Sequence, residues 1–455
     1  MQNTILQEIV KNKFIWLKTQ KQKKPLKNFK KKIQKTDRNF YQSLNNIRPF
    51  FILECKKTSP SSGIIREKFN LIDICHTYKK YASVISVLTD EKYFHGKLEF
   101  ISIARSIVSQ PILCKDFFID PYQVYLARYY QADAILLMLS ILDNAQYNTL
   151  SKIATDMNMG VITEVNNETE LHRAILLNAK VIGINNRNLH DFSIDLNRTK
   201  SIAPLVPKNI KVISESGIYN YSQVRNLSKL VHGFLIGSSL MKQKNLDIAI
   251  RRIIIGDNKV CGLTEGKDAE ISKKYGAIYG GLIFVKNSRR YVRENIAIKI
   301  ISKADLYYVG VFRNENIHYV VSIATLLNLK AVQLHGSEDQ NYINKLRDQL
   351  PYEIKIWKSC SIKNVVPNHS FKNISYYIFD NLEGGSGKSF NWSVLANCNL
   401  SNVILAGGLN SKNCIRASQL GCAGLDFNSG VEDNFGKKDP KKIFSVFHSL
   451  RNYSS

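Results

Sequence analysis

The chain has 455 residues, 44 % of them hydrophobic, and a formal net charge of +27. This length predicts two domains of roughly 200 residues each, because a single core rarely grows larger. The longest apolar runs, VISVL and AILLML, are far below the roughly 20 residues that a membrane-spanning helix needs. The opening MQNTILQEIVKNKF mixes charges into an apolar helical pattern, which is not the pattern of a secretory signal.

The eight cysteines form no CxxC pair and lie mostly in apolar runs. This usage predicts small buried thiols in a reducing compartment, and it argues against a disulfide framework or a zinc site. No HExxH motif is present, so we expect no metal. The sequence thus predicts a cytoplasmic protein without a membrane partner.

Lysines crowd the segment KTQKQKKPLKNFKKKIQK at residues 18–35. Clustered lysines can bind nucleic acid, because they release the counterions of phosphates. The alternative is a solvated lysine-rich surface, and no RNP motif, zinc knuckle or helix-turn-helix signature accompanies the charge. We therefore expect no nucleic-acid partner, although a basic surface also attracts small anionic substrates.

After the lysine-rich segment, short apolar runs alternate with longer helix-like segments. The runs predicted as strands are 51–55, 82–88, 111–115, 133–139, 160–165, 181–186, 211–217 and 233–239. Continuous apolar strands of this kind are typical of a parallel sheet covered by helices on both faces. Eight such units in about 200 residues predict a TIM (β/α)8 barrel.

The pattern then restarts near residue 258. The second series of predicted strands is 258–263, 280–285, 306–312, 331–336, 354–358, 376–381, 402–408 and 423–429. An open doubly wound sheet is the alternative. Two series of eight, with no GxGxxG after a first strand, favour an α/β chain of two consecutive TIM barrels. We place the domains at 1–255 and 256–455.

Polar residues end six of the eight strands in the first half, whereas the strands mostly begin on apolar residues or glycine. These strand-end residues are Glu54, Lys56, Lys115, Glu164, Asn185, Arg187, Glu215, Ser216, Gly237 and Ser238. In a TIM barrel the active site lies at the C-terminal ends of the strands. Any one of these residues could equally form an ordinary salt bridge at the rim. As a set, lysines and glutamates in one apolar cup predict acid–base chemistry, because burial and neighbouring charges shift their pKa values.

Two turns, ESG at 215–217 and IGSS at 236–239, follow the seventh and eighth strands. Barrels commonly bind phosphate there through backbone N–H groups, so we expect a phosphorylated anion as ligand. Glu54 and Lys56 alternate along the first strand, so both can point into the cup. Cys55 between them would point outward, toward the helices.

The first half closely resembles indole-3-glycerol-phosphate synthase, through FILECKKTSPSSG (51–63), SVLTDEKYFHG (86–96), PILCKDF, ITEV, GINNRNL, ISESG and FLIGSSLM. That family closes the indole ring on 1-(2-carboxyphenylamino)-1-deoxyribulose 5-phosphate, with loss of CO2 and water. The resemblance implies that Lys115 is the principal general acid and that Lys56 contacts the carboxylate and phosphate side of the substrate. Glu164 would serve the dehydration, and Glu54 would hold the lysines and the substrate hydroxyls.

The resemblance also implies the binding residues. Asn185 and Glu215 would line the ring-binding part of the cup, and the phosphate would lie against Ser59, Gly217, Gly237 and Ser238. A helix over residues of about 3–18 would cover the barrel mouth. Ser62 stands where many family members have lysine.

In the second half, Cys261 lies at the end of the first predicted strand and Asp380 at the end of the sixth. A thiol and a carboxyl across one cup form a plausible acid–base pair, because the thiolate can accept a proton while the acid donates one. Taken alone, Cys261 would more often be a buried core cysteine.

This half closely resembles N-(5′-phosphoribosyl)anthranilate isomerase, through CGLTEG, GGLIFV, VGVFRN, VQLHG, DNLEGGSG, LAGGL and GLDFNSGVE. That family converts an aminoaldose phosphate into the aminoketose by an Amadori rearrangement, and the product is the substrate of the first barrel. The resemblance implies that Cys261 removes the C2 proton, that Asp380 opens the furanose ring, and that Arg290 holds the anthranilate carboxylate. The phosphate would lie against Gly407, Gly408, Ser429 and Gly430.

Two further positions are less clear from the sequence. His335 could belong to the site or be a satisfied core residue, and Glu265 stands where relatives often have arginine. The order of the halves resembles the bifunctional tryptophan-biosynthesis enzyme of some bacteria. The alternative is a catalytically degenerate double barrel that binds or scaffolds. We expect a monomer that acts on small phosphorylated anthranilate derivatives. The resemblance also implies that no cofactor is needed, because neither reaction uses one.

Overall fold

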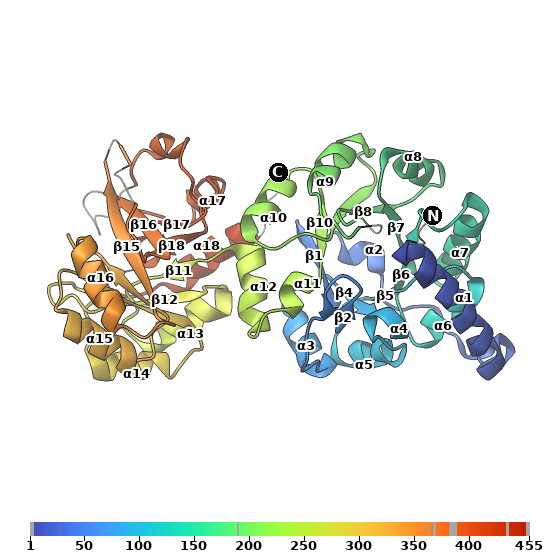
Figure 1. The fold of residues 1–455 in the computed structure, drawn as a ribbon, viewed down its shortest axis with the longest axis horizontal. Helices are drawn as coiled ribbons and strands as arrows, with labels where there is room; N and C mark the ends of the chain where they lie inside the picture. Colours follow the sequence, from blue (N-terminus) through green and yellow to red (C-terminus); the bar gives the residue numbers. More distant parts are fainter. Residues whose placement is uncertain are drawn as a thin grey trace. The chain divides into compact units, whose positions relative to one another are not determined.

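The computed structural model describes residues 4–188, 191–363, 365–366, 370–381, 389–433 and 436–451. The chain forms two compact units, one containing most residues up to Ile250 and the other most residues from Arg251 onward. Each unit contains a closed barrel of eight parallel strands (Figure 1). The prediction of two consecutive α/β TIM barrels is confirmed.

The strands of the first barrel pair in chain order. They are β1 (Phe50–Cys55), β4 (Val84–Leu88), β5 (Ile112–Lys115), β6 (Ala134–Met138), β7 (Gly160–Val165), β8 (Val181–Asn185), β9 (Lys211–Glu215) and β10 (Gly233–Ile236). The barrel closes where β1 pairs with β10, from Phe50 opposite Gly233 to Leu53 opposite Ile236. A short antiparallel hairpin, β2 (Thr58–Ser59) and β3 (Gly63–Ile64), follows β1. Each predicted strand is present, with ends that differ by at most a few residues.

Helices surround these strands (Figure 1). They are α1 (Ile5–Lys23), α2 (Phe40–Ser43), α3 (Leu71–Tyr78), α4 (Glu91–Phe94), α5 (Glu99–Ile107), α6 (Pro121–Tyr129), α7 (Asn144–Asp156), α8 (Glu168–Leu176), α9 (Asn197–Ile202), α10 (Tyr221–Leu227), α11 (Ser238–Met241) and α12 (Leu246–Ile255). Local sequence explains several starts: Asp120 and Gln123 form a capping box at α6, and proline occupies its first turn. Cys55 contacts Cys75 of α3, so it faces the helix layer as predicted.

The N-terminal helix is longer than predicted. We expected it over residues of about 3–18, but α1 extends to Lys23, into the lysine-rich segment. Lysine and glutamine are good helix formers, and lysines in the last turn interact favourably with the helix dipole. The helix stops before Pro25, which cannot continue the hydrogen-bonding pattern.

Large aromatic side chains close the N-terminal end of the first barrel. A Cβ atom on Gly160 would lie 2.1 Å from Cδ1 of Phe40, and one on Gly233 would lie 2.3 Å from the Phe50 ring. Glycine at these two strand starts therefore gives the rings room, and both rings are fully buried. These rings thus belong to the hydrophobic core that fills the barrel interior at the N-terminal ends of the strands.

The second barrel also pairs in chain order. Its strands are β11 (Lys259–Val260), β12 (Tyr279–Ile283), β13 (Tyr307–Phe312), β14 (Ala331–Leu334), β15 (Lys355–Ile362), β16 (Tyr376–Asn381), β17 (Val403–Leu405) and β18 (Gly424–Phe427). Its helices are α13 (Gly266–Tyr275), α14 (Glu294–Ile301), α15 (Ile317–Leu326), α16 (Gln340–Gln349), α17 (Cys414–Ser418) and α18 (Pro440–Arg451). Closure occurs between β11 and β18, with Lys259 opposite Asp426.

Strand β15 is the clearest difference from the predicted boundaries. The prediction ended at Lys358, but the strand continues to Ile362 and pairs with β16 up to Asn381. Its last residues alternate between buried and exposed, with Cys360 and Ile362 buried. This alternation, and not a continuous apolar run, forms the end of the strand. Within the described ranges, none of the helices combines the length and the apolar character that a bilayer crossing requires.

Candidate active sites

One pocket at the C-terminal ends of the first barrel contains all the residues predicted for that site. These are Glu54, Lys56, Ser59, Lys115, Glu164, Asn185, Arg187, Glu215, Ser216, Gly217, Gly237 and Ser238. Leu6 and Ile9 of α1 also line the pocket, so this helix lies at the barrel mouth as predicted. The strand-end pattern in the sequence therefore identified a real cluster of side chains.

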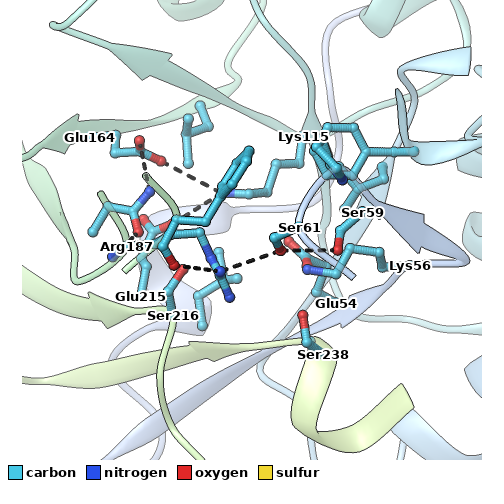
Figure 2. A pocket seen from close by; sticks show the side chains of 18 of the residues that line it. Glu54, Lys56, Ser59, Ser61, Lys115, Glu164, Arg187, Glu215, Ser216 and Ser238 are labelled. Atoms are coloured by element: carbon cyan, nitrogen blue, oxygen red, sulfur yellow. Dashed lines mark hydrogen bonds and ion pairs between the residues drawn. The ribbon is translucent and has the colours of Figure 1, made fainter. Parts of the chain in front are cut away.

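Lys115 lies between two carboxylates in this pocket (Figure 2). Its Nζ atom is 3.0 Å from Glu215 Oε2 and 3.7 Å from Glu164 Oε2. Burial alone would lower the pKa of Lys115, but the three carboxylates of the pocket outweigh burial and raise it. Lys115 is therefore a protonated cation, 19 % exposed, that lies between carboxylates in the pocket.

The two carboxyl groups of Glu164 and Glu54 are shifted in opposite directions. Burial raises the pKa of Glu164 to about 7, although Lys115 opposes the shift. Burial also acts to raise the pKa of Glu54, but Lys56 and Lys115 outweigh it and lower the pKa. The Glu54–Lys56 ion pair measures 2.7 Å. Two carboxyl groups whose pKa values are pushed apart are suited to different tasks, one in proton transfer and the other as a fixed charge.

Within the described part of the chain, only one of the two Glu215 carboxylate oxygens has a hydrogen-bond donor. Its Oε2 binds Lys115, but no donor within the described residues reaches the buried Oε1. Neighbouring Gly183 makes room for this oxygen, because a Cβ atom there would lie 2.0 Å from it. Buried acceptors nearly always have a donor, so Glu215 Oε1 is available to a ligand.

Glycines allow the backbone to approach the pocket at the predicted phosphate turns. Ser216 and Gly217 have φ angles of 65° and 80°, in the left-handed region that favours glycine. A Cβ atom on Gly217 would lie 2.4 Å from Ile194, and one on Gly237 would lie 2.4 Å from Glu54 Oε1. Helix α11 begins immediately after Gly237, so its first N–H groups lie beside the pocket.

Arg187 reaches across the pocket mouth. Its guanidinium donates to Ser61 Oγ at 3.3 Å and so links the segment after β8 to the segment after β1 (Figure 2). The sequence interpretation did not identify Ser61, which lines the pocket. Ser62, the position that differs from the family, is exposed and is not among the residues that line the pocket.

A buried ion-pair cluster next to this pocket was also missed. Lys13 of α1 is 3 % exposed, and its Nζ lies 2.7 Å from both Asp90 Oδ2 and Asp116 Oδ1. Asp116 directly follows Lys115. The available signal was a lysine on the apolar face of α1, in line with Ile9 and Leu17.

A second pocket contains all the residues predicted for the other barrel. These are Cys261, Arg290, Asp380, Gly407, Gly408, Ser429 and Gly430. Burial raises the pKa of Cys261, while Lys259 opposes this shift. Burial also raises the pKa of Asp380 to about 6. The carboxyl group is thus closer to neutrality than an exposed aspartate, as a proton donor should be.

Arg290 is held by a carboxylate of its own barrel. Its Nε and one terminal nitrogen donate to the two oxygens of Glu432 at 2.9 and 2.8 Å. Lys438 donates to the same carboxylate. The bidentate contact fixes the orientation of the guanidinium beside the pocket. Glu432 lies in the GLDFNSGVE motif, but the sequence interpretation gave it no role.

His335 lines the second pocket, and it is also satisfied. Its Nδ1 lies 2.8 Å from Ser359 Oγ. Burial and nearby cations lower its pKa to about 4, so the imidazole is neutral near pH 7. Glu265 instead caps α13 together with Asp268 and does not line the pocket.

Three interior residues of the second barrel were missed. Lys259 is fully buried, and its Nζ lies 2.7 Å from Asp426 Oδ2 and 3.0 Å from Gln333 Oε1. Gln333 and Asp426 line the pocket. The signals were available: Lys259 precedes Cys261 by two positions, and Asp426 is a charge inside an apolar strand. Among the described residues, no three His, Cys, Asp or Glu side chains are grouped as metal ligands would be.

Comparisons with known proteins agree with this geometry. The family model of indole-3-glycerol phosphate synthase matches residues 6–253, and that of N-(5′-phosphoribosyl)anthranilate (PRA) isomerase matches residues 258–449. The tryptophan biosynthesis protein TrpCF of Buchnera aphidicola subsp. Diuraphis noxia is 62 % identical over 453 residues, which covers 100 % of both chains. TrpCF of Salmonella typhi is 55 % identical over 450 residues, covering 99 % of this chain and 100 % of that one.

Among solved structures, the phosphoribosyl anthranilate isomerase of Thermus thermophilus is similar to this chain with a TM-score of 0.38 and 27 % identity, over 42 % of this chain and 97 % of that one. The two family matches fall on the two barrels, and the relatives match over the full length. The chain therefore belongs to the family of bifunctional tryptophan-biosynthesis enzymes, with an indole-3-glycerol-phosphate synthase domain followed by a phosphoribosylanthranilate isomerase domain.

Proposed function

We propose that the residues gathered in the two pockets carry out two successive steps. In the second barrel, Asp380 protonates the furanose oxygen of N-(5′-phosphoribosyl)anthranilate, and the ring opens. Cys261, as thiolate, then removes the proton from C2, and the aminoketose forms. The raised pKa of Asp380 supports its role as the acid, and the cation of Lys259 supports formation of the thiolate. Arg290 holds the anthranilate carboxylate.

The first barrel then acts on this aminoketose, 1-(2-carboxyphenylamino)-1-deoxyribulose 5-phosphate. Lys115 protonates the ketone oxygen while the aromatic ring attacks the carbonyl carbon, and loss of CO2 restores aromaticity. Glu164 serves the dehydration that completes the indole, and its pKa near 7 suits proton transfer at neutral pH. Glu54 fixes Lys56, which contacts the carboxylate and phosphate side of the substrate.

The binding residues complete the proposal. In the first pocket, Ser59, Gly217, Gly237 and Ser238 bind phosphate through their turns, while Asn185 and Glu215 contact the ring part. Glu215 Oε1, which no donor among the described residues reaches, supports this contact. In the second pocket, phosphate lies against Gly407, Gly408, Ser429 and Gly430. The single observation that carries the proposal is that all these residues, chosen from the sequence, line only two pockets, one in each barrel.

Freshly generated phosphoribosylanthranilate provides the test. Wild-type protein should consume the fluorescent substrate and form indole-3-glycerol phosphate. Cys261→Ala should stop the first step, and Lys115→Ala should accumulate the aminoketose. Matched controls are Cys398→Ala and Lys152→Ala, which lie outside both pockets and should leave both steps intact. Loss of neither step in the two pocket variants would remove these side chains from the mechanism. Turnover of neither compound by the wild type would favour a degenerate scaffold.

Three wider expectations remain proposals. We place the domain boundary between residues 255 and 256, where α12 ends. The eight cysteines are all free, which supports a reducing compartment such as the cytoplasm. We also expect a monomer without a nucleic-acid partner, which light scattering and retention on a polyanion column at moderate salt would check.

A further inference from the structure

The second pocket contains a carboxylate that the mechanism above does not use. Asp426, on β18, is 6 % exposed and lines the pocket together with Cys261 and Asp380. Its Oδ2 accepts a hydrogen bond from Lys259 at 2.7 Å. Its Oδ1 is buried, and no donor in the described part of the chain reaches it. An unpaired buried carboxylate oxygen is costly, so a donor from a ligand would be favoured there.

In an ion pair with only a structural role, both carboxylate oxygens are expected to accept hydrogen bonds from protein donors, as they do in a second ion pair of this barrel. Glu432 has the same kind of buried setting, but both of its oxygens are occupied, by Arg290 and Lys438. Lys259 also contacts Gln333 and Cys261, and no donor among the described residues reaches Asp426 Oδ1. Asp426 therefore resembles Glu215 of the first barrel, which also pairs one oxygen with a lysine and keeps the other unpartnered in the pocket.

Asp426 also lies close to the reacting groups. Its charge raises the pKa of both Cys261 and Asp380, which requires that it be near each of them. A Cβ atom on Gly281 would lie 2.6 Å from Cys261 Sγ and 2.9 Å from Lys259 Cε. The thiol and the lysine that holds Asp426 thus converge on one glycine. If Cys261 removes the C2 proton, as proposed above, C2 and the hydroxyl groups beside it would lie at this place.

We propose that Asp426 contacts the substrate of the isomerisation directly and accepts at Oδ1 a hydrogen bond from a sugar hydroxyl on C2 or C3. The inference rests on the proposed function of this pocket. Burial raises the pKa of Asp426, while Lys259 opposes this shift and fixes Oδ2, so that Oδ1 faces the sugar. Asp426 thereby orients the C2 proton toward Cys261. A hydrogen bond of a hydroxyl to a charged carboxylate is stronger than one between neutral groups.

The test uses two stable analogues of the product on the full-length protein. One is the reduced aminoketose, which keeps its hydroxyl groups, and the other is the same compound without the hydroxyls at C2 and C3. Each analogue is measured as an inhibitor of the isomerase reaction, for wild type and for Asp426→Asn. Inhibition of the synthase reaction, on the same chain, reports whether the variant protein is intact.

The wild-type isomerase should bind the deoxy analogue about 10- to 100-fold more weakly, as expected for loss of a hydrogen bond to a charged group. Asp426→Asn should weaken the hydroxylated analogue by a similar factor and change the deoxy analogue by no more than about twofold. Equal weakening of both analogues would overturn the proposal, because Asp426 would then act only through Lys259. Unchanged binding of both would overturn it as well.

A crystal structure of the wild type with the reduced aminoketose keeps the proposal testable if the variant barrel does not fold. A sugar hydroxyl within about 3.2 Å of Asp426 Oδ1 is expected, and a longer distance refutes the contact. Failure of the proposed function itself would look different, because the wild type would then turn over no phosphoribosylanthranilate at all.

Discussion

Replacing Lys13 by methionine tests how the N-terminal helix is held on the first barrel. Lys13 is the shared partner of Asp90 and Asp116, at 2.7 Å each, and all three side chains are at most 6 % exposed. Methionine keeps most of the volume but leaves two buried carboxylates without their cation. Removing one partner of a buried ion pair typically costs about 3–5 kcal/mol, and here the loss affects two carboxylates.

For a domain of this size, that loss corresponds to a decrease of about 6–20 °C in the melting temperature. Thermal inactivation of the synthase activity measures the effect, and the isomerase activity of the same chain is the internal control. The Lys13→Met variant should also have a lower synthase turnover than the wild type at temperatures far below the melting temperature, because Leu6 and Ile9 of α1 line the synthase pocket. Lys18→Met, at an exposed position of the same helix, should leave both properties unchanged. A melting temperature within about 2 °C of the wild type for Lys13→Met would refute the reasoning, because the ion-pair cluster would then contribute less than about 1 kcal/mol.

Three further predictions concern the pockets and their coupling. Burial raises the folded-state pKa of Glu164 above its unfolded value, so its contribution to stability is present at low pH and is lost as the pH rises toward about 7. Glu164→Gln should therefore stabilise the first barrel more at pH 8 than at pH 5, and thermal melts showing the opposite order would contradict this. Gly237→Ala should lower synthase activity with little change in isomerase activity, because its Cβ atom would lie 2.4 Å from Glu54 Oε1. Steady-state assays of both steps measure this, and an unchanged synthase activity would contradict the prediction. Because each barrel has its own pocket, unlabelled aminoketose added in excess should dilute labelled intermediate, and undiluted label in the indole product would contradict free release.

The sequence was sufficient for the architecture and for the residues at the strand ends. Parallel barrel strands are continuous apolar runs, so a charged residue at the end of such a run is expected to lie at the C-terminal rim of the barrel. Glu54, Lys115 and Asp380 were predicted on this basis or by family resemblance, and the structure brings them to the expected pockets.

Residues whose partners lie far along the chain were not predictable in the same way. Lys259 and Asp426 become neighbours only when β11 pairs with β18, and the register of that pairing is a property of the closed barrel. Lys13 likewise meets Asp90 and Asp116 only after the helix has docked at the mouth. The predicted ends of α1 and β15 were too early because the last residues of both elements include polar ones. In α1 these residues are good helix formers, and in β15 the pairing with β16 extends the strand.

The pairing of β1 with β10 has a consequence for synthesis of the chain on the ribosome. Strand β1 is made early, but one of its edges stays unpaired until Gly233–Ile236 has been translated. Throughout this interval β1 exposes backbone groups that another strand can capture. The isomerase half is translated only after β10, so the synthase barrel can close while the second half is still being made. Chain order thus protects the first barrel from pairing with strands of the second.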